Sequence, residues 1–140
     1  MSVWKLLFSF EGRIQRSRFW LGVLCWLGIE WGGYLVFAVL RRSFEAHPFG
    51  FAFLGLIWGT ALTWALVAIQ VKRWHDRGKS GFMVLILLVP VLGAVWSFVE
   101  LGLLAGRIGT NDYGPDPLAG ARGITAQRSA AHPPADRPDA

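Results

Sequence analysis

The sequence predicts an all-α, polytopic membrane protein with three transmembrane helices and an N-terminal segment in the membrane interface. Of the 140 residues, 54% are hydrophobic and only 16% are charged, whereas charged residues make up about a quarter of a soluble domain. Three continuous apolar runs of 22 to 25 residues cover half of the chain. A helix of roughly 20 residues crosses about 30 Å of hydrocarbon, so each run is long enough to span a bilayer.

The N-terminal segment combines aromatic and aliphatic residues with arginines, which is typical of a helix lying in the interface plane. The apolar runs follow at residues 19–40, 49–71 and 82–106. We expect helices there because a lipid-embedded backbone must satisfy its polar groups internally, and the runs lack the alternation of barrel strands. The first run starts too late and is too long for a cleaved signal peptide. Pro90 predicts a kink in the third helix, with a re-entrant hairpin as the less favoured alternative.

Residues 1–118 are expected to form one membrane domain. The stretch NDYGPDP, at residues 111–117, is dense in turn-forming residues and predicts a structured end to the domain. Residues 119–140 are rich in Ala, Pro and Arg without an apolar period, so we expect a disordered tail. The single cysteine, Cys25, excludes an intrachain disulfide.

The distribution of basic residues predicts the orientation and the partners. The net charge is +5, and eight basic residues precede the first run or lie between the second and third: Lys5, Arg13, Arg16, Arg18, Lys72, Arg73, Arg77 and Lys79. The opposite side of a three-span protein would hold Arg41, Arg42 and Arg107 near the membrane. The N-terminus is therefore predicted to be cytoplasmic and the C-terminus to be outside. Cations beside apolar runs favour anionic lipid headgroups as partners and not nucleic acid.

Pairs of glycines at four-residue spacing occur in each run. They are Gly28 and Gly32, Gly55 and Gly59, and Gly102 and Gly106. This spacing places both glycines on one face of a helix, where they let two helices approach closely. Packing within the protein is favoured over contact between copies, and both uses of the motif stay open.

Two carboxylates, Glu30 and Glu100, lie inside the apolar runs. An ionisable group at membrane depth costs roughly 2.5–3.5 kcal/mol on insertion scales and is a candidate functional site. The functional interpretation is a proton or cation site. The structural one is a protonated Glu that bonds within the bundle, for example to Thr60, Thr63 or a tryptophan.

The loop VKRWHDRGKSGF, at residues 71–82, contains three candidate chemistries. GKS is typical of a phosphate-binding loop, but Arg73 stands where that motif needs glycine and a membrane helix precedes it. His75 and Asp76 suggest a metal site or a base, yet no further metal ligands are near in the sequence. Ser80 is the only nearby candidate for a nucleophile, and no oxyanion-binding feature accompanies it. A basic loop that contacts lipid phosphates is the favoured interpretation.

Three motifs in order resemble the bacterial inner-membrane proteins of domain of unknown function family 805. The motifs are FEGRIQRSRFW, VKRWHDRGKSGF and GTNDYGPDP. The residues that match are Gly12, Arg13, Arg16, Phe19 and Trp20 in the first, Lys72, Arg73, His75, Asp76, Lys79, Ser80 and Gly81 in the second, and Asn111, Tyr113, Gly114, Pro115, Asp116 and Pro117 in the third. Trp74 departs from the family pattern, where an aliphatic residue is common.

The resemblance implies a small multi-pass protein of the bacterial inner membrane with no established activity, cofactor or metal. The ordered motifs suggest a defined cluster, and we hypothesise that Asp76 pairs with Arg13 or Arg16. The favoured function is a non-enzymatic accessory or interaction module that contacts lipid headgroups or a membrane-protein partner. The alternative is a small transporter or channel subunit that uses Glu30 in an oligomer. A lipid-modifying enzyme at His75 and Asp76 is least favoured.

Overall fold

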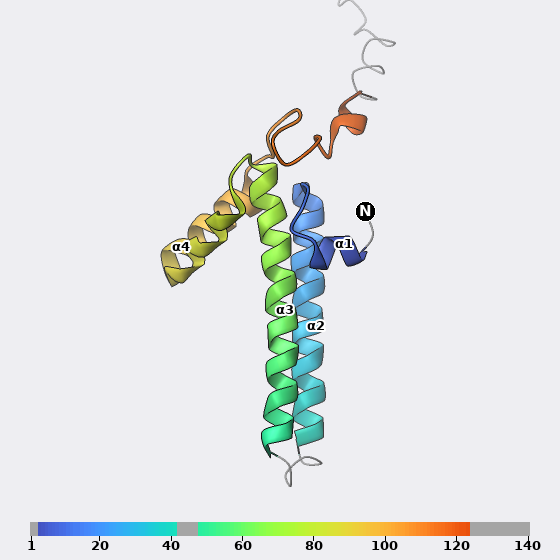
Figure 1. Cartoon of the computed structure of the whole chain (residues 1–140), viewed down its shortest axis with the longest axis vertical. Coiled ribbons are helices and arrows are strands. Elements are labelled where there is room, and N and C mark those ends of the chain that lie inside the picture. Colours follow the sequence, from blue (N-terminus) through green and yellow to red (C-terminus); the bar gives the residue numbers. More distant parts are fainter. Residues whose placement is uncertain (1–2, 42–47, 124–140) are drawn as a thin grey trace, which may run out of the picture.

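The computed structural model describes residues 3–41 and 48–123, which are helical apart from connecting turns and one isolated bridge. The elements are α1 (Val3–Phe8), α2 (Arg16–Leu40), α3 (Pro48–Asp76), the 3₁₀ helix η2 (Gly81–Leu88), α4 (Pro90–Ser97) and the π-helical turn η3 (Phe98–Leu103). Helices α2 and α3 run side by side as a long antiparallel pair, and α1 lies crosswise near one end of it (Figure 1).

Helices α2 and α3 are long and apolar enough to cross a membrane. Only 6% of the most apolar window of α2 and 17% of that of α3 is buried inside the protein. A core helix of a soluble protein would be mostly buried, whereas lipid can cover an apolar surface of this kind. The two runs predicted at 19–40 and 49–71 therefore form helices, which extend a few residues further than expected.

The third run differs from the prediction, because no continuous helix covers residues 82–106. The chain turns back at Val89, which has an extended backbone, and α4 begins at Pro90. Proline is well suited to the first turn of a helix, where its missing N–H needs no partner. The second arm, Pro90–Leu103, has 14 residues and a length of about 21 Å, which is too short for about 30 Å of hydrocarbon.

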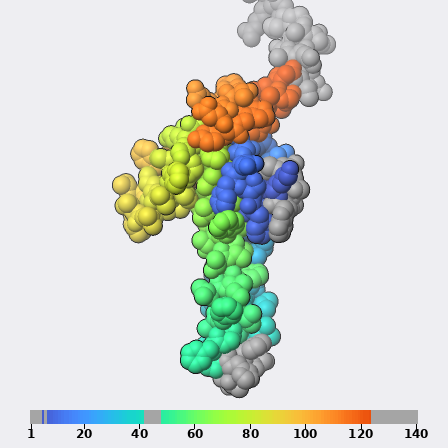
Figure 2. All heavy atoms as spheres, in the orientation of Figure 1, coloured from blue at the N-terminus to red at the C-terminus, as the bar shows by residue number. Residues whose placement is uncertain are grey.

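A glycine lets the two arms of this hairpin meet. A Cβ at Gly93 would lie 1.9 Å from the carbonyl oxygen of Ile86, so only a residue without a side chain fits there. We call residues 81–103 the hairpin. It diverges from α3 and reaches only part of the way along the α2–α3 pair (Figures 1 and 2). The expectation of a kinked single helix is therefore wrong, because the chain folds back on itself as a hairpin at Val89.

The hairpin also changes the predicted arrangement of the termini. Residues 104–123 cover the same end of the α2–α3 pair that holds the N-terminal segment (Figure 2). The sequence predicts this segment on the opposite side from the N-terminus, whereas the structure brings the two segments into contact, because the hairpin returns the chain to the end from which it started. We call this end, with residues 3–20, 72–81 and 98–123, the head.

Different glycines from those predicted hold α2 against α3. A Cβ at Gly33 would lie 2.6 Å from the Trp58 ring, and one at Gly22 would lie 3.0 Å from Ile69. By contrast, a Cβ at Gly28 or Gly32 would meet nothing within 4 Å. The prediction of packing within the protein is therefore wrong for these two glycines, and their contact with a second copy stays a prediction.

The main cluster of buried hydrophobic side chains lies where the head meets the ends of α2 and α3. It consists of Ile14, Phe19, Ile69, Trp74 and Leu101, which come from the N-terminal segment, both long helices and the hairpin. Segments far apart in the sequence are thus fixed to one another at the head, which positions the polar side chains described next.

Candidate functional site

Five successive carbonyl groups at the C-terminal end of the hairpin accept hydrogen bonds from side chains of other elements. Leu101 accepts from Arg73 Nε at 2.8 Å, Gly102 from Trp20 Nε1 at 3.1 Å, Leu103 from Arg16 Nη1 at 2.8 Å, Leu104 from Arg73 Nη2 at 2.5 Å and Ala105 from Arg77 Nη1. The last carbonyls of a helix have no partner in their own helix. Basic donors satisfy them and also interact favourably with the helix dipole.

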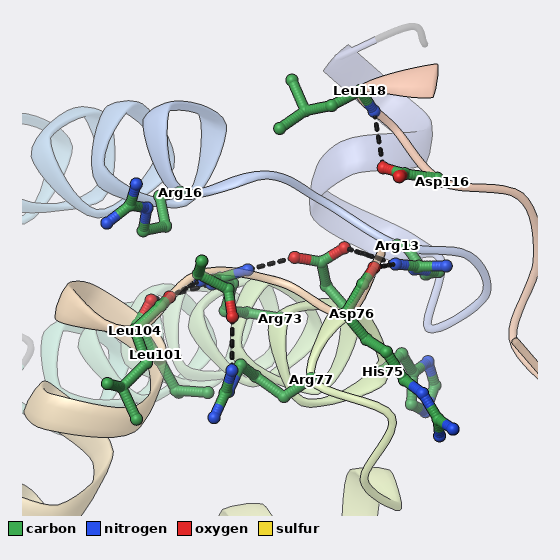
Figure 3. A network of polar contacts seen from close by, with 12 residues as sticks. Arg13, Arg16, Arg73, His75, Asp76, Arg77, Leu101, Leu104, Asp116 and Leu118 are labelled. Atoms are coloured by element: carbon green, nitrogen blue, oxygen red, sulfur yellow. Dashed lines mark hydrogen bonds and ion pairs between the residues drawn. The ribbon is translucent and has the colours of Figure 1, made fainter. Parts of the chain in front are cut away.

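Asp76 lies between two guanidinium groups in the head (Figure 3). Its Oδ1 accepts a hydrogen bond from Arg13 Nε at 3.2 Å, and its Oδ2 pairs with Arg73 Nη1. The side chains of Arg13 and Asp76 are 1% and 4% exposed. The Arg13–Asp76 pair expected from the sequence is confirmed, while Arg16 instead bonds to the hairpin.

Arg13 also joins the first motif to the third. Its Nη1 donates to the carbonyl oxygens of Gly109 at 2.6 Å and Gly114 at 3.2 Å, and its Nη2 donates to that of Arg107 at 2.5 Å. The planar fork of a guanidinium can serve several acceptors at once, which a lysine ammonium cannot do in this geometry. One side chain therefore holds the helix end of α3 and the segment after the hairpin together.

A glycine permits the hairpin exit to approach Asp76. A Cβ at Gly106 would lie 2.0 Å from Asp76 Oδ2, and one at Gly102 would lie 2.7 Å from the Trp20 ring. These two glycines were expected on the packing face of a spanning helix. They instead make room for two motif side chains in the head.

The third motif forms a tight turn against His75. Asn111 and Gly114 exchange backbone hydrogen bonds at 3.1 and 3.0 Å, and the Asn111 amide donates to the His75 carbonyl at 2.8 Å. The Tyr113 ring stacks on the His75 ring, with centroids 3.8 Å apart and planes 3° from parallel. His75 Nδ1 lies 3.3 Å from the carbonyl oxygen of Gly12. All three motifs therefore meet at the end of α3.

Asp116 closes the segment after the turn. Its carboxylate accepts from the backbone N–H groups of Leu118 at 2.9 Å and Gly109 at 3.2 Å and pairs with Arg122. The hydrogen bond from Leu118 is the main reason that the pKa of Asp116 lies below its ordinary value, although burial opposes the shift. Residues 119–123 form a helical turn, so the disorder predicted from residue 119 is wrong for them. Residues 124–140 lie outside the described part of the chain.

Glu100 lies in the head and not deep in a spanning helix. Its Oε1 is 2.6 Å from Lys79 Nζ and 3.2 Å from Arg77 Nη2. The hairpin brings this residue back to the level of the basic loop, so Glu100 pairs with loop cations and does not lie inside a long apolar helix as the sequence predicts. Lys79 also lies over the rings of Trp74 and Trp96, at 5.6 and 5.9 Å from their centroids.

Ser80 and Gly81 start the hairpin. The Ser80 hydroxyl accepts from the Phe82 N–H and thereby caps η2. A Cβ at Gly81 would lie 2.7 Å from the Val71 side chain, so glycine lets the first arm leave α3 without a clash.

Glu30 stands apart from the head. It is half-buried on α2, and it has no hydrogen bond or ion pair with any part of the chain that the structure describes, including Thr60 and Thr63. Within the described residues, Glu30 therefore makes none of the hydrogen bonds that the structural interpretation predicts for it. It also lies apart from Glu100.

The described residues of the head do not form the metal site that the sequence raises as a possibility. Within residues 3–41 and 48–123, no group of three or more His, Cys, Asp and Glu side chains could hold a metal ion. His75 and Asp76 are neighbours in sequence but bond to different groups. Arg13, Lys72 and Arg73 are buried. These three side chains therefore do not make the contact with lipid headgroups that the sequence predicts for the basic residues.

Sequence reasoning missed several contributors to the head. Arg77 was counted only as a loop charge, and Gly106 and Arg107 were not assigned to the motifs. The Arg107 N–H donates to the Asp76 carbonyl at 2.8 Å. The one available signal for these residues is position: Arg77 follows the matched Asp76, and Gly106 and Arg107 shortly precede the third motif.

Comparisons with known proteins agree with the motif pattern. The model of the DUF805 family, described as a protein of unknown function, matches residues 7–115. The uncharacterized protein YiiR of Escherichia coli is 31% identical over 83% of this chain and 90% of its own. Two inner membrane proteins of that organism, YhaH and YhaI, are 28% and 26% identical over 84% and 86% of this chain and 93% and 96% of theirs. No solved structure matches. The chain belongs to the DUF805 family of proteins of unknown function.

Proposed function

We propose that the protein crosses the bacterial inner membrane twice and inserts the hairpin into the cytoplasmic leaflet, with the head in the cytoplasm. The head carries ten Lys and Arg side chains and five carboxylates, whereas only Arg41 and Arg42 lie between the two spans in the sequence. This imbalance supports a cytoplasmic head by the positive-inside rule. Similarity to YhaH and YhaI, both named inner membrane proteins, supports the location.

Within that placement, we propose a non-enzymatic accessory or interaction module. One observation carries this proposal: the polar side chains of the three motifs bond mainly to one another and to the backbone. The carboxylate of Asp76 forms ion pairs with Arg13 and Arg73. Each carbonyl at residues 101–105 accepts a hydrogen bond from a side chain of the head. Such a network favours a rigid support over a reactive site. The surfaces left for recognition are the apolar faces of α2, α3 and the hairpin and the exposed cations around the head.

Cysteine labelling tests the placement. In a Cys25→Ser background, we expect Ser43→Cys, between the spans, to react with a membrane-impermeant maleimide in intact spheroplasts. We expect Ser129→Cys, in the tail, to react only after permeabilisation. Labelling of both positions in intact spheroplasts would contradict the two-span topology and support three spans.

Photo-cross-linking in native membranes tests the interaction role. A photoreactive residue in place of Leu35 or Val39, which are 62% and 76% exposed, is expected to capture a discrete membrane protein or a second copy of the chain. The matched control replaces Phe19, which is buried at 7% exposure. Capture of lipid alone from both exposed positions would refute a protein partner on this face.

A second candidate function is a transporter or channel subunit, which is favoured by Glu30, an ionisable group on α2 without a partner in the described part of the chain. Two spans and a short hairpin do not enclose a path, so this function requires an oligomer. We expect Glu30→Gln to abolish proton or cation flux into liposomes that contain the full chain. Unchanged flux, or no flux by the unmodified protein, would remove this candidate.

A further inference from the structure

An apolar groove opens where the hairpin leaves α3. It has a volume of about 500 Å³ and is lined by residues of α3, the start of η2, the N-terminal segment and the third motif. The lining includes Phe10, Val71, His75, Ser80, Leu85 and Tyr113. Because η2 and α3 diverge below the head (Figure 1), the groove lies between two elements that the proposed topology exposes to lipid.

We propose that this groove holds one anionic phospholipid of the cytoplasmic leaflet, with an acyl chain between α3 and η2 and the headgroup at the end formed by His75 and Ser80. The inference rests on the proposed placement of the head in the cytoplasm. It names a defined site for a lipid partner, whereas charge alone would predict only diffuse contact.

The groove has polar groups at one end and apolar walls along the rest, which matches the headgroup and acyl chain of a phospholipid. Its head end carries a hydroxyl at Ser80 and the ring of His75, and Val71 and Leu85 supply apolar walls. The Ser80 oxygen already accepts from the Phe82 N–H, which leaves its O–H free to donate to a phosphate oxygen. A few polar groups at one end of an apolar hollow of roughly 300–1,000 Å³ is the usual design of a small-molecule site.

The His75 ring is held in a fixed orientation with one nitrogen turned to the groove. Stacking on Tyr113 and the contact of Nδ1 with the Gly12 carbonyl fix the ring. Nε2 lies 3.3 Å from the position that a Cβ at Gly81 would occupy, and Gly81 also lines the groove. Among the described residues Nε2 has no hydrogen-bond partner. A ligand at the head end would supply one.

The exposed charges of the head favour an anionic lipid as the occupant. Lys5, Arg16, Arg18 and Arg107 are exposed there, against the carboxylates Glu11 and Asp112, and each Lys or Arg near an anionic leaflet contributes on the order of 1 kcal/mol of attraction to it. A helix of another copy would fill the apolar walls but would leave the Ser80 hydroxyl and His75 Nε2 without partners.

Two tryptophan variants on the same arm test the site. Leu85 lines the groove, whereas Leu88 is 79% exposed and does not line it, so Leu88→Trp is the matched control for Leu85→Trp. The full chain is purified in mild detergent, and bound lipid is counted by native mass spectrometry. Delipidated protein is then titrated with phosphatidylglycerol, phosphatidylcholine or inorganic phosphate.

We expect the unmodified chain and Leu88→Trp to retain one phospholipid and to bind phosphatidylglycerol more tightly than phosphatidylcholine. Leu85→Trp should bind at least about tenfold more weakly, because the indole displaces acyl methylenes that are otherwise removed from water. Inorganic phosphate should not displace the lipid. If Leu85→Trp is not monodisperse, Val84→Trp fills the same groove from the adjacent position.

Equal lipid retention by the Leu85 and Leu88 variants would overturn the proposal, as would competition by inorganic phosphate. Loss of a dimer instead of a lipid in Leu85→Trp would also overturn it and would identify a second copy as the occupant. Cysteine labelling at positions 43 and 129 is independent of these measurements. Failure of the lipid site therefore remains distinguishable from failure of the proposed topology.

Discussion

Replacement of Asp76 by Asn tests whether the buried charge cluster holds the head together. Asn has nearly the same volume as Asp, so the packing against Gly106 is kept while the negative charge is lost. Arg13 and Arg73 would then face each other without a carboxylate, and both are buried. Removing one partner of a buried ion pair costs about 3–5 kcal/mol.

That cost is large relative to the total stability of a protein of this size, which is typically about 5–15 kcal/mol. For a chain of this length, about 3 kcal/mol corresponds to a decrease of roughly 10 °C in the unfolding midpoint. We would measure the fraction of monodisperse protein after heating in detergent. The matched control is Asp112→Asn, which removes an exposed carboxylate of the same head that has no partner among the described residues.

A midpoint for Asp76→Asn within one or two degrees of the Asp112→Asn value would refute the argument that the cluster stabilises the head. Exchanging the charges, with Asp at position 13 and Arg at position 76, is not expected to restore stability. Arg13 also donates to the carbonyls of Arg107, Gly109 and Gly114, and an aspartate cannot replace those donors. Full rescue by the exchange would show that the ion pair alone matters.

Gly106→Ala should lower the unfolding midpoint strongly, because its Cβ would overlap Asp76 Oδ2. The control Gly28→Ala has open space around its Cβ and should leave the midpoint unchanged or raise it. Equal effects of the two variants would contradict the close approach of Gly106 to Asp76. Trp20→Phe should cost about 0.5–1.5 kcal/mol through the lost hydrogen bond to the hairpin carbonyl, measured by the same assay, and no loss would show that water replaces the indole. Because the pKa of Asp116 is lowered in the folded protein, its contribution to stability is present above its unfolded pKa of about 3.9 and is lost as pH falls below that value. Asp116→Asn should therefore narrow the difference in midpoint between pH 6 and pH 3, and an unchanged difference would assign the acid sensitivity to other groups.

The two long helices followed from the sequence because their cause is local. A continuous apolar run of more than 20 residues satisfies all its backbone polar groups in lipid as one helix, and neither α2 nor α3 depends on a distant contact to be helical. The Arg13–Asp76 pair was also predictable. Both residues lie in motifs on the same predicted side, and a buried carboxylate requires a cation nearby.

Only the tertiary structure decided the course of the third run. Its length and composition fit a span as well as a hairpin. The outcome depends on the contact of Gly93 with the backbone of the first arm and on the extended backbone at Val89 before Pro90. These are contacts between residues on opposing arms. A mean hydropathy over the run contains no information about them.

The roles of the basic residues were likewise decided by the fold. In the sequence they appear as loop charges suited to lipid phosphates. Once the hairpin returns its C-terminal end to the head, the carbonyls at residues 101–105 are left without helical partners. Arg16, Arg73 and Arg77 supply the donors to four of these five carbonyls. Composition determined that this protein occupies a membrane. Which charges face the membrane and which are buried inside the head depended on where a helix end came to lie, because a carbonyl needs a donor within hydrogen-bond distance, whatever its separation in sequence.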